Sequence, residues 1–131
     1  MGYVLSMDID LTGFSPAQQQ ALCDLLILSM FADGHLTTAR DTHLQGVLLS
    51  LGYAGDAERQ SAFDAAVDRM RPFVKSIWQA RAKVVLLARA FINRSQQKRV
   101  YDAVQDLMTA DQHVSAWECA LLSELRMTFR L

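Results

Sequence analysis

Apolar residues recur at intervals of three and four along nearly every segment of this chain, and no segment alternates convincingly between apolar and polar residues. That spacing lines one face of an α-helix, whereas a half-buried strand would need a period of two. With 131 residues, of which 51% are hydrophobic and 21% charged, the chain is long enough for one packed core. The sequence therefore predicts an all-α protein, a single compact helical domain of about six or seven helices.

Capping patterns indicate where three of the helices begin. Ser15 with Gln18, and Ser115 with Glu118, have the spacing of a capping box, in which two side chains satisfy free amides of the first helical turn. We expect Ser95 to cap a further helix, the one that precedes the helix starting at Ser115.

Pro72 is expected to start or kink a long helical segment that ends at Phe91, and the broad apolar face of this segment predicts that it is the central element of the core. Leu87 and Phe91 should be almost fully buried there. All helices are assigned to one domain, residues 1–131, in which residues 1–13 form a loosely ordered N-terminal segment.

The sequence repeats itself at a distance of 78 residues, which places residues 30–37 over residues 108–115 with four of eight positions identical. In this register Asp111 is equivalent to Asp33, and Glu118 is equivalent to Arg40. Each copy has the pattern of a helix, a short turn and a second helix. We therefore predict an internal helix–turn–helix duplication whose halves pack with approximate two-fold symmetry.

Three acidic residues at the repeated turns, Asp33, Asp111 and Glu118, have two interpretations. If the two-fold symmetry brings them together, their oxygens suit a divalent cation such as calcium, although the spacing excludes an EF-hand loop. Alternatively, the aspartates bond turn amides and Glu118 only completes its capping box. Arg40 favours the second interpretation, because its positive charge would repel a metal ion.

Residues 28–37 and 108–118 resemble the two turns of the tellurite-resistance TerB-like family, whose helical domain also occurs at the amino end of a DnaJ-type co-chaperone. The family pattern is an Ala-Asp-Gly turn with a glutamate seven residues after the aspartate, present twice. Residues 14–18 are similar as well. The resemblance implies a non-enzymatic stress-response module of the tellurite-resistance type, with a metal-binding acidic patch and a protein partner.

Two positions depart from the family pattern. Arg40 replaces the first glutamate, and Gln112 replaces the second glycine. The alternative is therefore a purely structural protein-interaction adaptor with a degenerate metal site.

Basic residues are concentrated between positions 69 and 99, which hold nine lysines and arginines and no acidic residue, although the whole chain has a net charge of −1. They either offset acidic neighbours on helix faces or form a face that docks an acidic or phosphorylated partner. The net charge argues against nucleic acid, and no apolar run is long enough for integral membrane association. Cys23 and Cys119 are expected to be thiols in the cytoplasm, and no catalytic motif indicates an enzyme.

Overall fold

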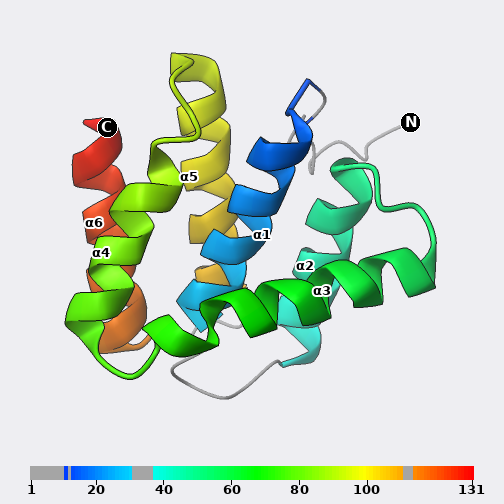
Figure 1. The fold of residues 1–131 in the computed structure, drawn as a ribbon, viewed down its shortest axis with the longest axis horizontal. Helices are drawn as coiled ribbons and strands as arrows, with labels where there is room; N and C mark the ends of the chain where they lie inside the picture. Colours follow the sequence, from blue (N-terminus) through cyan, green and yellow to red (C-terminus); the bar gives the residue numbers. More distant parts are fainter. Residues whose placement is uncertain (1–10, 12, 31–36, 111–113) are drawn as a thin grey trace.

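The computed structural model describes residues 11, 13–30, 37–110 and 114–131. In these parts the chain forms a compact domain of helices and contains no strand, which confirms the all-α prediction (Figure 1). Apart from one short 3₁₀ helix, η3 (Arg71–Phe73), the elements are α1 (Pro16–Met30), α2 (Thr38–Ser50), α3 (Asp56–Met70), α4 (Ile77–Ala88), α5 (Arg94–Thr109) and α6 (Ala116–Phe129).

Helix α1 is the central element of the bundle. It lies between α4, α5 and α6 on one side and α2 and α3 on the other (Figure 1), and its residues from Ala21 to Met30 are all buried. A helix that is buried on every side must be apolar nearly all round, as this one is. The prediction that residues 72–91 form the central helix is therefore wrong.

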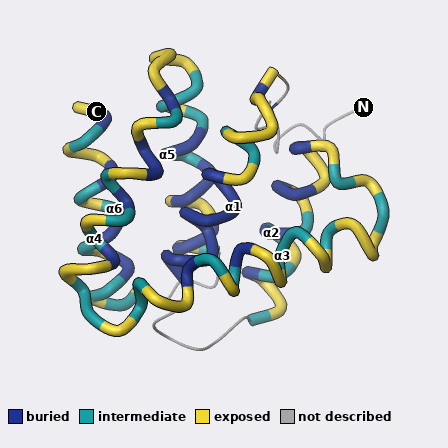
Figure 2. The backbone as a smooth tube through the Cα atoms, viewed as in Figure 1, coloured by how far each residue is buried: buried dark blue, intermediate teal, exposed yellow. Residues whose placement is uncertain are grey.

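Residues 72–91 do not form one helix. Pro72 has no amide hydrogen to continue the helical ladder, and the chain passes through η3 before Ser76 caps α4 by accepting a hydrogen bond from the Gln79 amide at 3.1 Å. Helix α4 ends at Ala88, and it buries only one face (Figure 2). Leu87 and Phe91 are nevertheless 9% and 1% exposed, as predicted.

The predicted caps are confirmed at two of three helix starts. Ser15 and Gln18 exchange hydrogen bonds of 2.9 and 3.1 Å around the start of α1, and Ser115 forms the same arrangement with Glu118 at α6. The cap of α5 is Asn93 rather than Ser95. Its side chain accepts from two amides of the first turn, which places the helix start one residue after it.

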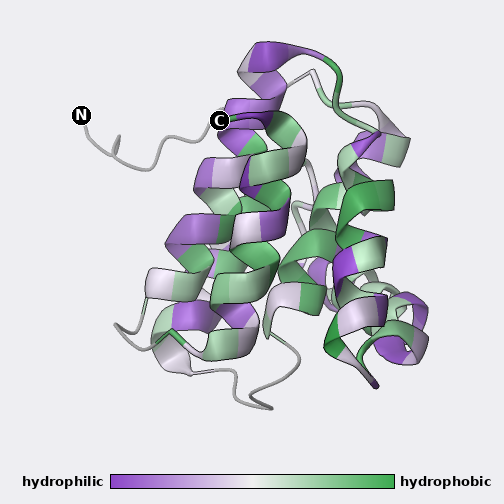
Figure 3. Cartoon of the chain, turned by 90° about the vertical axis from the view of Figure 1, so that its left-hand side faces the viewer, coloured by the Kyte–Doolittle hydropathy of each residue, from purple (hydrophilic) through white to green (hydrophobic). Residues whose placement is uncertain are grey.

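Aromatic side chains link the two ends of the chain in the core. The ring of Phe91 lies 5.5 Å from that of Phe14 and 6.5 Å from that of Phe129, measured between ring centroids. Of residues 1–13 the structure describes Leu11 and Gly13, and Leu11 is 2% exposed within the core. Figure 3 shows hydrophobic segments mainly where helices face one another and hydrophilic segments on the outer sides.

The internal duplication stays a prediction, and two contacts support it. Gln18 donates to Gln96 at 3.0 Å, and Arg40 forms an ion pair with Glu118. Both pairs are separated by 78 residues, so each joins positions that the repeat makes equivalent. Equivalent residues of two related units can touch only close to the axis that relates them.

None of the helices in the described part of the chain combines the length and the apolar character that a membrane span requires.

Replacing Phe91 with alanine should lower the free energy of unfolding by about 3–5 kcal/mol, because it removes a buried ring that contacts two other aromatic residues. Urea denaturation followed by circular dichroism measures the change. Ile92 provides a matched control, since it is the next residue and is 88% exposed. Ile92→Ala should change stability by less than about 0.5 kcal/mol. Equal losses in the two variants would contradict the assignment of Phe91 to the core.

Candidate functional site

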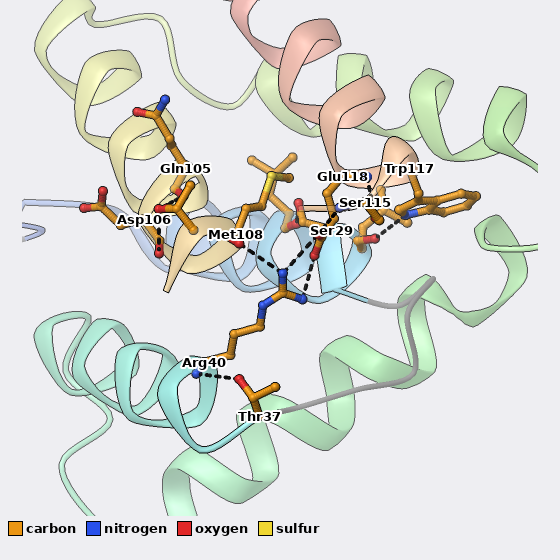
Figure 4. Close-up of polar contacts among 12 residues, drawn as sticks. Ser29, Thr37, Arg40, Gln105, Asp106, Met108, Ser115, Trp117 and Glu118 are labelled. Carbon is orange, nitrogen blue, oxygen red and sulfur yellow. Dashed lines mark hydrogen bonds and ion pairs between the residues drawn. The ribbon is translucent and has the colours of Figure 1, made fainter. Parts of the chain in front are cut away.

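A buried ion pair joins α2 to α6 where both helices begin (Figure 4). The Arg40 guanidinium approaches the Glu118 carboxylate with both terminal nitrogens, Nη1 to Oε2 at 2.6 Å and Nη2 to Oε1 at 3.0 Å. The side chains of Arg40 and Glu118 are 1% and 0% exposed. The Nη2 contact is a hydrogen bond, whereas the Nη1 contact is a close approach of opposite charges, so the guanidinium lies against both carboxylate oxygens.

The cap at each helix start positions one member of the pair. Thr37 accepts a hydrogen bond from the Arg40 amide at 3.2 Å, so Arg40 projects from the first turn of α2. Ser115 accepts from the Glu118 amide at 3.2 Å, and its own amide donates to Glu118 Oε1 at 2.9 Å. Glu118 therefore completes its capping box, as one interpretation of the sequence predicted, and binds Arg40 with the same carboxylate.

Two further contacts at this site connect the start of one helix to the end of another. Arg40 Nη2 donates to the carbonyl of Met108, near the C-terminal end of α5, at 3.0 Å. The indole of Trp117 donates to the carbonyl of Leu28, in the last turn of α1, at 3.2 Å. The last carbonyls of a helix lack partners within the helix and carry partial negative charge, so Arg40 is well suited to its place.

The predicted metal ligands are only partly placed by the structure. Asp33 and Asp111 lie outside the described residues, and Glu118 binds Arg40 instead of standing open to a cation. Among the residues that are described, no three acidic, histidine or cysteine side chains come together as a metal would require. Arg40, read from the sequence only as a residue that repels metal, is the direct partner of the predicted ligand.

A second buried carboxylate, Asp24 of α1, is bound by Arg69 of α3. The guanidinium donates to both oxygens of Asp24, at distances between 2.8 and 3.2 Å. Burial raises the pKa of the Asp24 carboxyl, and the Arg69 hydrogen bonds oppose this rise. The pair fastens α3 to α1, and no sequence pattern predicted that these two residues are partners.

An open groove of about 860 Å³ lies beside this pair, between α1 and α3. Its walls carry mainly small side chains, and Arg69 and Tyr53 add polar atoms. Cys23 also lines the groove and is 3% exposed. Burial is the largest cause that raises the pKa of the Cys23 thiol to about 12, so at neutral pH it is an uncharged thiol and a poor nucleophile.

Several basic residues between positions 69 and 99 have the neutralising role that the sequence suggested. Four of them form ion pairs with carboxylates: Arg69 with Asp24, Arg71 with Asp68, Arg81 with Glu124, and Lys98 with Asp102. Arg94 binds the carbonyls of Phe129 and Arg130 at the end of α6. Lys75 and Arg89 are exposed, and no ion pair joins either to a carboxylate of the described chain.

Removing one member of the buried pair should be far more costly than removing one member of an exposed pair. Arg40→Met leaves Glu118 buried without its guanidinium, and we expect the free energy of unfolding to fall by about 3–5 kcal/mol. The matched control is Arg71→Met, which breaks an exposed pair with Asp68 and should cost less than about 1 kcal/mol.

Glu118→Leu combined with Arg40→Met should restore much of the lost stability, because neither charge is then stranded. Denaturant titrations of the single and double variants give the coupling energy. Additive losses would contradict a direct interaction between the two side chains.

The two cysteines should differ strongly in reactivity. At pH 8 a thiol reagent such as iodoacetamide should modify exposed Cys119 within minutes, whereas Cys23 should react only after unfolding. Mass spectrometry with and without urea identifies the modified residue. Rapid modification of Cys23 in the folded protein would contradict its burial.

The raised pKa of Cys23 also means that the free energy of unfolding should fall as the pH rises above about 9 towards 12, because the unfolded thiol ionises in this range and the folded one does not.

Searches of models of protein families, of curated proteins and of solved structures find no match to this chain.

Proposed function

We propose that this chain is a non-enzymatic, TerB-like interaction module of the tellurite-resistance type, a cytoplasmic adaptor that binds a protein partner. In this proposal the Arg40–Glu118 pair has the role that a metal ion would otherwise have at the two turns. The observation that carries the proposal is the position of that pair, because Glu118 is the residue that the family pattern assigns to the acidic patch.

The ion pair supports a degenerate metal site on chemical grounds. A cation at Glu118 would compete with a guanidinium that holds both carboxylate oxygens, and it would lie within a few ångströms of another positive charge. The guanidinium already supplies what a divalent ion would supply, which is a positive link between helices that start far apart in the sequence.

The ionisable groups in the core support a structural rather than a catalytic role. Asp24 and Glu118 are buried, and each binds a guanidinium that also fastens two helices together. Catalytic acids need access to a substrate, whereas pairs that join helices inside a core are typical of structural ion pairs.

Calcium should not change the melting temperature of the unmodified protein, even at about 1 mM. That concentration matches the dissociation constants of the weakest calcium sites in proteins. Arg40→Glu provides the positive arm of the test. It places a second carboxylate beside Glu118 and should lower the melting temperature, because two like charges are then buried together. Calcium should raise the melting temperature of this variant again if Asp33 and Asp111 face the two carboxylates.

Differential scanning fluorimetry with calcium and with a chelator measures both responses. A calcium-dependent rise in the unmodified protein that is lost in Asp111→Asn would contradict the proposal and establish a metal site.

The adaptor role is tested in cells that carry the gene. Its deletion should raise sensitivity to tellurite, and a double variant, Asp33→Asn with Asp111→Asn, should restore resistance as well as the unmodified gene. Failure of this variant, with normal amounts of folded protein, would show that the acidic turns are needed. Unchanged resistance in the deletion strain would contradict the assignment to tellurite resistance.

A further inference from the structure

The outer face of α4 carries exposed apolar and basic side chains together, which is unusual for a helix packed on a core. Trp78 is 72% exposed and Leu86 is 53% exposed, although Ala80, Val84 and Leu87 on the opposite face are buried. Residues 78, 82 and 86 are four apart, so they form one row along the helix. Ile92, in the turn that follows, is 88% exposed.

Basic residues flank this row, and their charge is not neutralised locally. Lys75 lies directly before the Ser76 cap of α4, three residues from Trp78, and Arg89 directly follows the last residue of the helix, three residues from Leu86. Both are exposed and without an ion-pair partner in the described chain, and no acidic residue occurs between positions 69 and 99. Glu124 of α6, the helix that packs against α4, is paired with Arg81, and Asp68 near the end of α3 is paired with Arg71.

Trp78 is held in place on this surface. The guanidinium of Arg81 lies 5.4 Å from the centroid of the indole ring, while its Nε donates to Glu124 of α6 at 3.1 Å. The ring is therefore supported by a side chain that is itself anchored to the next helix. Such a cation–π contact leaves one face of the indole for another surface.

The charges of the molecule would orient it toward an anionic surface. Helix α4 lies at one end of the long axis in Figure 1, and α3 starts at the other end. Asp56, at the start of α3, is paired with Arg59, but Glu58 and Asp64 on the same helix are exposed and form no ion pair within the described chain. An anionic surface would thus attract the α4 end and repel the start of α3.

We propose that the outer face of α4, with Lys75, Trp78, Leu86 and Arg89, docks on an anionic membrane surface. Tryptophan favours the headgroup level of a bilayer, and lysine and arginine are attracted by anionic lipids. The exposed side chains project outward from one helix rather than line a groove, which suits a flat surface. The groove that would suit an inserted peptide lies elsewhere, between α1 and α3. This inference is independent of the metal site and of the proposed adaptor role.

The test is a titration of the full chain with vesicles of two compositions. Vesicles of phosphatidylcholine containing about one-quarter phosphatidylglycerol should bind the protein at low salt, and vesicles of phosphatidylcholine alone should not. Trp78 should report the contact by a blue shift of its fluorescence and by quenching with brominated lipids. The second tryptophan, Trp117, donates its indole hydrogen bond within the fold, so its emission should stay constant.

Matched variants distinguish binding through the α4 face from nonspecific hydrophobic binding. Leu86→Ala should lower the partition coefficient about tenfold. Leu49→Ala makes the same change on α2, at a residue that is 55% exposed, and should leave binding unchanged. Lys75→Gln and Arg89→Gln should each lower the coefficient about fivefold. All four positions are exposed, so the variants should fold, and circular dichroism checks this.

Three results would overturn the proposal. One is the absence of binding to anionic vesicles at low salt. Another is an equal loss of binding in the Leu86 and Leu49 variants. The third is capture of the protein by polyglutamate or duplex DNA, through the same residues, without binding to vesicles; it would assign the face to an acidic protein or to a nucleic acid.

Discussion

The ion pair between Arg40 and Glu118 is the interaction on which the arrangement of the helix ends depends. Two opposite charges lie in the core at the starts of α2 and α6, and the same guanidinium binds a carbonyl near the end of α5. Taking charged groups out of water is costly, so such a pair adds little net stability over apolar side chains of the same size. The pair does favour one arrangement of the helices, because a core with α2 or α6 out of place would leave a buried charge without its partner. The caps at Thr37 and Ser115 then act together with the pair, since each fixes the backbone from which one charge projects.

Around this link the bundle is organised by α1. Ten consecutive residues of this helix are buried, including Asp24 and Ser29, whose polar groups are satisfied inside the core. Asp24 binds Arg69 on one side, and Leu28 accepts a hydrogen bond from Trp117 on the other. Helix α1 therefore contacts its neighbours through polar links as well as apolar packing. Because α1 occupies the centre, α4 lies at the periphery and keeps an outer face in solvent. On that face the exposed Trp78 lies near basic residues that have no ion-pair partner in the described chain.

The two contacts between residues 78 positions apart give the repeat a physical meaning. Gln18 meets Gln96, and Arg40 meets Glu118, at places where related halves would approach their common axis. At such a place a symmetric pair of identical charges would be unfavourable, since two glutamates or two arginines would repel each other. One arginine and one glutamate remove this conflict without a metal ion, whereas two glutamates need a cation between them. If the predicted duplication holds, Arg40 would let the two related segments pack directly against each other without a metal ion.

The sequence by itself determined the local features of this protein. The three- and four-residue spacing predicted helices throughout, and the Ser15 and Ser115 boxes predicted two helix starts. The apolar spacing also predicted that Leu87 and Phe91 are buried, although Phe91 lies beyond the end of α4. These features depend on residues close in the chain, so the pattern contains the information. Tertiary structure alone decided which helix is central, which cation meets Glu118, and that Arg69 binds Asp24. Those outcomes depend on residues 45 to 78 positions apart, brought together by packing that no local pattern specifies. The acidic pattern left both metal binding and capping open for Glu118, and it could not reveal that a guanidinium from another helix contacts this carboxylate.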